Sequence, residues 1–291
     1  MVTSKRILVT GSDGQLGNAI KSESLQYNSH IFFFKNKNQL DISNFSLLQN
    51  EIKKMKVDII INCAAYTNVA QAEKEKQTAN IVNNIAVENI AKICSKENIQ
   101  LIHISTDFVF DGKKESPYKE NDQTNPLNYY GFTKLEGEKR ILEKKLKSSI
   151  IIRTSWLYSK QKNNFVYKII NKIKKNDRLN VVLDEFGSPT NSDNVASFIL
   201  EILPYINNTK TEIYNFSNSG ICSRIEFAEE IMSLLGESKV IEPIFSSSSS
   251  DVIRPRFSAL DLSKTKIKFG VDMIDWKTSL KSFFKKNKNL C

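Results

Sequence analysis

A glycine-rich loop near the start of the chain separates a short apolar run from a helical pattern. Residues 6–10 are mostly aliphatic and β-branched, as in a buried parallel strand, and residues 15–25 carry an amphipathic helical pattern. Gly11, Gly14 and Gly17 stand at the junction. In a strand–turn–helix unit, glycines permit a tight turn and close backbone approach, so that free amides at the helix N-terminus can hold a pyrophosphate. The loop therefore predicts an α/β fold with a dinucleotide site.

The following segments continue the alternation of strands and helices. Strands are expected near residues 6–10, 31–34, 58–62, 100–106 and 149–154, and helices near residues 15–25, 44–55, 78–96 and 128–147. This order predicts a Rossmann-like, doubly wound parallel sheet with right-handed crossovers. We assign residues 1–155 to an NAD(P)-binding domain. Residues 156–291 are assigned to a smaller C-terminal substrate-binding lobe that is partly interleaved with the first domain.

The pattern within this lobe is more mixed. We expect a helix near residues 164–175, a short strand near 180–183 and another helix near 193–203. The serine run at 246–250 is typical of a mobile loop.

Tyr130 and Lys134 are four residues apart within a predicted helix. Side chains at that spacing lie on one helical face, one turn apart. A nearby ammonium favours the phenolate and lowers the pKa of a tyrosine from about 10 toward the range useful for proton transfer. We therefore interpret Tyr130 as a general acid, in preference to Tyr129, whose partner four residues on is Thr133. The alternative is a surface tyrosine packed along a lysine stem.

A polar group also ends the strand expected at residues 100–106. Ligands gather at the carboxyl ends of parallel strands. Ser105 or Thr106 would donate a hydrogen bond there and polarise a substrate carbonyl for hydride attack. His103, inside the same strand, is interpreted as a packing residue because the sequence supplies no catalytic partner for it.

Several longer stretches give the chain a specific resemblance. The G-x-x-G-x-x-G spacing of the loop resembles the extended short-chain dehydrogenase/reductases. Residues 105–112 (Ser-Thr-Asp-Phe-Val-Phe-Asp-Gly), 126–138 and 153–158 (Arg-Thr-Ser-Trp-Leu-Tyr) are similar to the dTDP-4-dehydrorhamnose reductase family. Later motifs follow in the family's order, at residues 163–165, 187–190 and 254–260. The similarity covers nearly the whole chain.

The resemblance implies NAD(P)H-dependent reduction of the C4 keto group of dTDP-4-dehydro-6-deoxy-L-mannose to dTDP-L-rhamnose. Thr106, Tyr130 and Lys134 would form the catalytic trio, with Tyr130 protonating the C4 oxygen and Lys134 also holding the nicotinamide ribose. The family's cofactor positions match the loop, an adenine contact at Asp41 and Ile42, and a segment along the cofactor. In full they are Gly11, Gly14, Gln15, Leu16, Gly17, Asp41, Ile42, Ala64, Ala65 and Tyr66, together with Tyr130 and Lys134.

Substrate contacts follow from the same resemblance. The positions assigned to the sugar nucleotide are Thr106, Asp107, Trp156, Asn164, Arg254 and Arg256. We expect the two arginines to clamp the substrate diphosphate through their guanidinium groups. Without the family match they would be interpreted as surface arginines flanking a proline turn.

The chain departs from the family pattern at three places. Lys35 ends the second strand where an acidic residue would accept hydrogen bonds from the adenosine ribose. Because a lysine there would attract a 2′-phosphate, we expect NADPH to be preferred over NADH. Phe108 replaces the usual tyrosine and leaves the substrate range open. Some members bind magnesium at a dimer contact through a glutamate, and because Ala19 stands at that position we expect no metal site.

Composition excludes other classes of protein. The 291 residues are 40% hydrophobic and 25% charged, as in ordinary globular proteins, and no apolar stretch approaches the ~20 residues of a membrane span. The net charge of +10 comes from scattered lysines without a nucleic-acid-binding module, so we expect no nucleic-acid partner. The N-terminus lacks a signal-peptide pattern, and the four cysteines lack metal-site spacing. We expect a cytoplasmic protein and allow for a homodimer.

Two alternative functions remain open from the sequence. The chain would reduce a different nucleotide-linked 4-keto sugar if the later loops set another specificity. It would be a non-catalytic partner if it resembled the regulatory subunit of methionine adenosyltransferase, which has the same fold.

Overall fold

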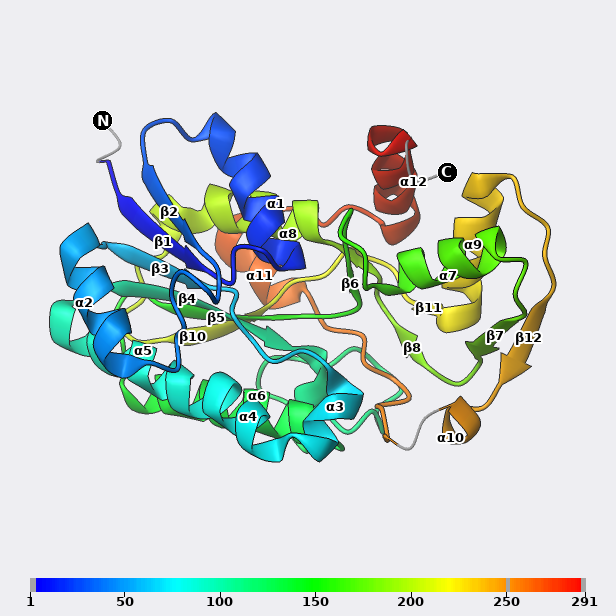
Figure 1. The fold of residues 1–291 in the computed structure, drawn as a ribbon, viewed down its shortest axis with the longest axis horizontal. Helices are drawn as coiled ribbons and strands as arrows, with labels where there is room; N and C mark the ends of the chain where they lie inside the picture. The colour runs from blue at the N-terminus through cyan, green and yellow to red at the C-terminus, as the bar shows by residue number, and fades with distance from the viewer. Residues whose placement is uncertain (1–3, 250–251, 289–291) are drawn as a thin grey trace.

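Six parallel strands form the centre of the molecule in the computed structural model, which describes residues 4–249 and 252–288 (Figure 1). Their order across the sheet is β10-β5-β4-β3-β1-β2. The bounds are β1 (Arg6–Thr10), β2 (Ile31–Lys35), β3 (Ile59–Asn62), β4 (Gln100–Thr106), β5 (Ile150–Thr154) and β10 (Glu212–Asn215). Every neighbouring pair is parallel, so the predicted Rossmann-like sheet is confirmed.

Helices cover both faces of this sheet, because successive strand side chains point to opposite faces (Figure 1). Ile7 and Val9 of β1 face one apolar layer, which includes α1 (Gln15–Glu23), α8 (Ser192–Ile202) and α11 (Ser263–Phe269). Leu8 faces the other layer, formed by α2 (Phe45–Met55), α5 (Ala86–Glu97) and α6 (Tyr129–Glu143). Because both faces are buried, the strands are almost continuously apolar.

The second half of the chain returns to this sheet before it completes the lobe. Its strand β10 pairs with β5 at the sheet edge, and α8 packs against α1. The lobe itself holds three two-stranded pairs: β6 (Leu157–Tyr158) with β9 (Thr190–Asn191), β8 (Phe186–Gly187) with β11 (Cys222–Ser223), and β7 (Leu179–Val182) with β12 (Ile241–Ile244). Around them pack α7 (Phe165–Lys174), α9 (Arg224–Leu235) and α12 (Trp276–Lys286), with Tyr158, Phe227 and Phe283 in their shared core.

Two elements differ from the sequence prediction. The helix expected at 78–96 is divided into α4 (Lys76–Asn80), one π-helical segment, η2 (Ile81–Ile85), and α5. The loop expected at 246–250 is a short helix, α10 (Ser246–Ser249), and Ser250 lies outside the described residues. Asp184 explains this helix, because its carboxylate accepts hydrogen bonds from the Ser246 amide at 2.8 Å and hydroxyl at 2.9 Å.

The remaining short elements are α3 (Val69–Lys74) and the 3-10 turns η1 (Ser24–Gln26), η3 (Asp107–Val109) and η4 (Leu203–Tyr205). Across the described part of the chain, no helix has the length and apolar character needed to cross a membrane.

Candidate active site

A cavity of about 860 Å³ opens at the carboxyl ends of the parallel strands. The glycine loop, the strand ends and α6 form one wall, and Trp156 and Arg224 belong to the lobe side. The structure brings together on its walls most of the residues predicted from the sequence: Gly11, Gly14, Gln15, Leu16, Gly17, Asp41, Ile42, Ala64, Ala65, Tyr66, Thr106, Asp107, Tyr130, Lys134 and Trp156. Residues more than one hundred positions apart therefore share one site.

Backbone geometry explains the glycines of the loop. Gly11 has a φ of +64°, and a Cβ on it would lie 2.6 Å from the Ala64 nitrogen. A Cβ on Gly17 would overlap the Gly11 carbonyl oxygen. Gly14 is the N-cap of α1 and provides no side-chain hydrogen bond to the first turn. The first amides of α1 are therefore left without a capping side chain beside the cavity, which suits an anionic pyrophosphate.

The prediction for Lys35 places its side chain wrongly. Lys35 is the last residue of β2, in register with Thr10, and its ammonium lies 3.9 Å from the Glu51 carboxylate of α2. It does not line the cavity, whereas Lys37, two residues on, does. Because β2 extends one residue further than expected, Lys35 still belongs to the sheet and Lys37 to the loop over its edge.

Asn164 also has a different position from the predicted substrate contact. Its side chain caps α7, accepting a hydrogen bond from the Tyr167 amide and donating to the carbonyls of Ser159 and Gln161. The side chain is 5% exposed and is absent from the cavity wall. The local role of an N-cap asparagine accounts for this residue.

Tyr130 is half-buried beside Thr106 and Asp107. Its ring lies 5.8 Å from that of Phe108 in an edge-on arrangement. Burial raises the pKa of Tyr130 to about 12, which outweighs the lowering effect of a hydrogen bond with Thr106 and is reinforced by the charge of Asp107. The expected fall of this pKa toward neutrality is therefore wrong, because burial raises it instead. A phenol with this pKa is fully protonated near neutral pH, as a proton donor must be.

Lys134 is only 2% exposed. Its Nζ donates to the Ile104 carbonyl at 2.6 Å and lies 3.4 Å from Nε2 of His103. Burial lowers the pKa of Lys134 to about 8, while the Glu138 carboxylate opposes the shift. His103 is fully buried, as expected of a packing residue, and it also contacts Lys134, a neighbour that the sequence did not indicate.

Glu138 belongs to a buried ion pair that sequence reasoning missed. The carboxylate accepts two hydrogen bonds from Arg153, at 2.9 and 2.6 Å, and one from the Ser105 hydroxyl at 2.5 Å. The Ser105 hydroxyl is therefore used within this network, because it donates its proton to Glu138. The spacing of Lys134 and Glu138, one helical turn apart, was the available signal.

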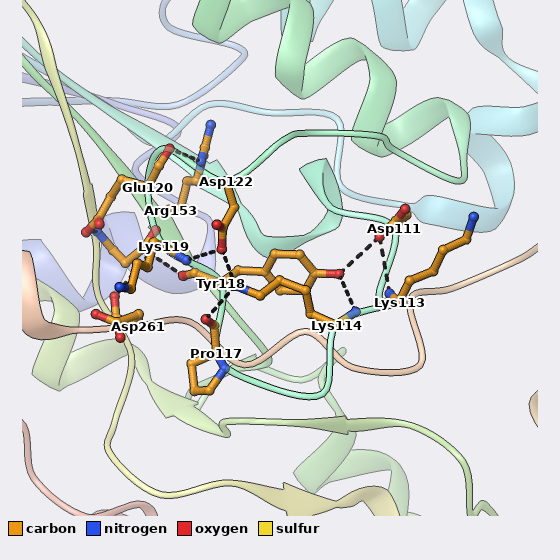
Figure 2. Close-up of polar contacts among 11 residues, drawn as sticks. Asp111, Lys113, Lys114, Pro117, Tyr118, Lys119, Glu120, Asp122, Arg153 and Asp261 are labelled. Carbon is orange, nitrogen blue, oxygen red and sulfur yellow. Dashed lines mark hydrogen bonds and ion pairs between the residues drawn. The ribbon is translucent and has the colours of Figure 1, made fainter.

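Arg153 also fastens the loop that leads away from the site. Its guanidinium donates to the Glu120 carbonyl at 3.1 Å (Figure 2). The guanidinium also lies over the ring of Phe110, 5.1 Å from its centroid, and Tyr118 stacks on the same ring. The Tyr118 hydroxyl donates its proton to Asp111 at 3.0 Å (Figure 2). These contacts fix the segment that follows the turn bearing Asp107.

The π-helical segment positions the cofactor-side loop. Asn83 accepts a hydrogen bond from the Tyr66 amide at 2.8 Å and donates to the Tyr66 carbonyl at 3.0 Å. Its amide also donates to the Thr133 hydroxyl of α6 at 3.1 Å. One buried side chain therefore ties the segment around Tyr66 to the helix that carries Tyr130 and Lys134.

Trp156 and Arg224 build the lobe side of the cavity. Trp156 has a φ of +44°, and the Arg224 guanidinium lies 3.4 Å from its ring centroid. A Cβ on Gly187 would lie 2.6 Å from the indole, so only glycine permits this packing. Arg224 is also paired with the Glu185 carboxylate at 3.2 Å. The sequence motifs gave no indication of Arg224, which begins α9 directly after the Ser223 capping box.

Lys168 and Arg254 lie near Arg224 and form a cluster of three cations with it. Burial lowers the pKa of Lys168, and the charges of Arg254 and Arg224 lower it further. Within the described residues, Nε of Arg254 is buried and has no hydrogen-bond partner. Arg256 is exposed, and neither Arg254 nor Arg256 is on the cavity wall itself. The structure thus separates the two predicted arginines, because only Arg254 joins the cation cluster.

Asp107 faces this positive charge from the sheet side. Burial raises the pKa of Asp107 to about 6, while hydrogen bonds with Ser258 and Thr106 and the charge of Arg224 act in the opposite direction. Its Oδ2 is buried and has no hydrogen-bond partner within the described residues. An unpaired acceptor on the cavity wall suits a ligand hydroxyl.

Ala19, at the position expected to exclude magnesium, is buried within α1. In residues 4–249 and 252–288, no group of three or more His, Cys, Asp and Glu side chains is arranged to hold a metal ion.

Comparison with known proteins agrees with this architecture. Residues 5–289 match the family model described as the RmlD substrate binding domain. The dTDP-4-dehydrorhamnose reductase of Aggregatibacter actinomycetemcomitans is 37% identical, over 95% of this chain and 97% of its own length. The dTDP-4-keto-6-deoxy-D-glucose reductase of Streptomyces niveus is 30% identical, over 88% of each chain.

Solved structures of such reductases also have a similar fold. The crystal structure of the dTDP-4-dehydrorhamnose reductase of Bacillus anthracis in complex with NADP superimposes with a TM-score of 0.91. It is 34% identical and covers 97% of this chain and 99% of its own. The match therefore includes both the sheet and the lobe.

Proposed function

Because the chain belongs to the RmlD substrate-binding family, we propose that it is an NAD(P)H-dependent reductase that converts dTDP-4-dehydro-6-deoxy-L-mannose to dTDP-L-rhamnose. The observation that carries the proposal is the placement of Thr106, Tyr130 and Lys134 on the same cavity as the glycine loop. A regulatory subunit without turnover has no need of an ammonium buried at this place, because a charge is costly to bury.

Tyr130 is the proton donor in this reaction. When bound, the reduced nicotinamide supplies the hydride to the keto carbon. Tyr130 then protonates the sugar oxygen, and the Thr106 hydroxyl beside it orients that oxygen. The buried ammonium of Lys134 favours the phenolate that remains.

The cofactor fits the loop and the wall beside it. The α1 N-terminus binds the pyrophosphate, and the close packing of Gly17 on Gly11, which a side chain would prevent, sets the shape of the loop that leads into α1. Lys37 replaces Lys35 as the contact for a 2′-phosphate, since it lines the cavity at the end of β2. Asn36 donates to Asp13 at 2.7 Å, and no carboxylate ends β2. This arrangement supports a preference for NADPH.

The substrate diphosphate is the natural partner of the cation cluster. Lys168, Arg224 and Arg254 bring three positive charges close to one another. Glu185 forms an ion pair with Arg224 and so balances one of these charges. Guanidinium groups bind phosphate oxygens in a bidentate way, and the buried Nε of Arg254 retains an unused donor. Trp156 would then lie against the nucleotide sugar on the same wall.

The test is oxidation of reduced cofactor by the purified protein with dTDP-4-dehydro-6-deoxy-L-mannose generated in situ. We expect a loss of absorbance that depends on the sugar, recovery of dTDP-L-rhamnose, and a lower KM for NADPH than for NADH. A Lys37→Ala variant should lose the preference between the two cofactors, whereas Lys35→Ala should retain it. Cofactor binding without any oxidation would contradict the proposal.

A second candidate is reduction of a different nucleotide-linked 4-keto sugar. The Streptomyces niveus relative supports it, because that protein is named for the D-glucose series. Phe108, next to Tyr130, removes a hydroxyl that the family usually has beside the reacting carbon. Parallel assays with both 4-keto sugars decide between the two, and the higher kcat/KM identifies the substrate.

A further inference from the structure

A chain of buried polar side chains runs across the sheet beneath the cavity and ends at Lys134. The Thr10 hydroxyl donates to Oδ1 of Asn62 at 2.6 Å, and Nδ2 of Asn62 lies 3.0 Å from Nδ1 of His103. Nε2 of His103 lies 3.4 Å from Nζ of Lys134. The four side chains are 0 to 2% exposed and come from the ends of β1 and β3, the middle of β4, and α6.

The charge of Lys134 determines which hydrogen bonds this chain can make. A protonated amine has only donors, so Nε2 of His103 must accept and the ring proton must sit on Nδ1. Nδ1 then donates, and the Asn62 amide must turn over from its orientation in the structure, so that its oxygen faces the ring and its NH₂ group donates to the Thr10 hydroxyl. A neutral Lys134 instead accepts from Nε2, and Asn62 keeps the orientation of the structure, with its NH₂ group on Nδ1 and its oxygen on Thr10. The two amide orientations of Asn62 thus match the two ionisation states of Lys134.

We propose that His103 is a positioning residue for Lys134, which holds one N–H of the ammonium through Nε2 while Asn62 sets the position of the ring proton. The Ile104 carbonyl holds a second N–H at 2.6 Å. The third N–H is thereby aimed by the other two, and Lys134 lines the cavity. This inference rests on the proposed function only where it assumes that the third N–H acts on the cofactor or on Tyr130 in the cavity.

The other ionisable groups around the pair are few. Glu138 is one turn further along α6 and favours the ammonium, and the Cys63 thiol at the end of β3 faces Lys134 from the cofactor side. Tyr130 is one turn earlier on α6. Burial lowers the pKa of His103 well below its usual value, and the charge of Lys134 lowers it further. The imidazole therefore stays neutral, and only its tautomer responds to Lys134.

The chain contains two histidines, so the ring nitrogens of His103 are directly observable by ¹⁵N NMR of the full-length protein. A His30→Gln variant assigns the spectrum. At pH 7 we expect a protonated Nδ1 and an unprotonated Nε2 in His103, and a reversal or averaging of the two signals as Lys134 titrates. In Lys134→Met the Nε2 signal should shift. Identical His103 spectra in the wild type and Lys134→Met, at all pH values, would overturn the proposal.

This measurement does not require turnover, so it separates the proposal from the proposed function. If the protein reduces no sugar nucleotide and the His103 signals still follow the ionisation of Lys134, the positioning role of His103 is supported and only the proposed reaction is contradicted. Thr10→Val offers a milder perturbation, because it removes the hydroxyl that fixes Asn62 without removing side-chain volume. It should increase the averaging of the two tautomers, and an unchanged tautomer ratio would argue against the role of Asn62.

Kinetics provide the second readout. His103→Phe cannot accept a hydrogen bond, so we expect the alkaline limb of the kcat profile to move down by about one pH unit, with substrate KM changed less than about twofold. His103→Gln keeps an amide oxygen as acceptor and should restore most of the shift. Equal profiles for the Phe and Gln variants would assign His103 to packing alone.

Discussion

The two walls of the cavity are built in different ways. On the sheet side, Thr106, Tyr130 and Lys134 lie at a strand end and on one face of α6, so regular secondary structure fixes their spacing. On the lobe side, Trp156 follows β5 and Arg224 begins α9, and their contact depends on Gly187 and on the Glu185 ion pair. The first wall is set by local geometry and the second by long-range packing.

This difference matches a division of labour. The sheet wall carries the groups that we propose to transfer or favour a proton, and such groups need accurate positions. The lobe wall carries cations and an indole, which under the proposed function recognise phosphate and sugar by charge and shape. We therefore expect changes on the sheet wall to lower kcat and changes on the lobe wall to raise the substrate KM.

The largest expected effect is on the sheet wall. Tyr130→Phe removes the proton donor and should lower kcat by about 10² to 10⁴, the usual contribution of positioned acid catalysis. Cofactor affinity, measured by fluorescence titration, should change little because the glycine loop is untouched. Tyr129→Phe is the matched control, since Tyr129 is adjacent in sequence but is not on the cavity wall. A Tyr130→Phe enzyme with wild-type kcat would remove Tyr130 from the mechanism.

The same contrast explains what the sequence alone could predict. The glycine loop and the Tyr130–Lys134 pair are local patterns, so their geometry follows from strand and helix periods, and both line the same cavity in the structure. Lys35 was misplaced because a one-residue extension of β2 is enough to direct it to Glu51. Strand ends are decided by pairing with a neighbour, which the pattern of one segment does not contain.

Arg224 and Asn164 show the limit on the lobe side. Asn164 looked like a ligand contact within a family motif, but its role as the N-cap of α7 uses its side chain fully. Arg224 carries no motif, and its function depends on contacts with Trp156 and Glu185, 68 and 39 positions away. Contacts between residues so far apart in the sequence cannot be predicted from local sequence patterns.

A smaller effect is expected from the lobe wall. Arg254→Ala removes a donor for the substrate diphosphate and should raise the substrate KM by about 10-fold or more, with kcat nearly unchanged, as for loss of a charged hydrogen bond. Arg256→Ala is the matched control, because this exposed arginine lies two residues away and outside the cation cluster. Steady-state kinetics measure both.

The opposite pattern would contradict the assignment of the lobe wall to binding. If Arg254→Ala lowered kcat and left KM unchanged, the division between the two walls would be wrong. Equal effects of Arg254→Ala and Arg256→Ala would show that general positive charge, and not the buried Nε of Arg254, attracts the substrate.

A further effect concerns stability and the sheet wall. Burial lowers the pKa of Lys134 from 10.5 to about 8, so below pH 8 both the folded and unfolded states bind the proton and the folded state bears the cost. A shift of this size corresponds to about 3 kcal/mol. Lys134→Met removes that cost but also the hydrogen bond to Ile104, so we expect it to stabilise the fold by about 2 kcal/mol at pH 7 while it abolishes turnover.

The sign of the pH dependence gives a sharper test. Between pH 8 and 10.5 the unfolded wild type binds the proton of Lys134 and the folded state does not, so this group makes the wild type more stable as pH rises. The advantage of Lys134→Met in urea denaturation should therefore shrink over that window. Lys139→Met, at an exposed position on the same helix paired with Glu136 at 2.7 Å, is the control and should show no such trend. A destabilised Lys134→Met at pH 7 would mean that the contacts of the ammonium with Ile104, His103 and Glu138 exceed its cost of burial, and the sheet wall would then be held together by the same groups that perform its chemistry.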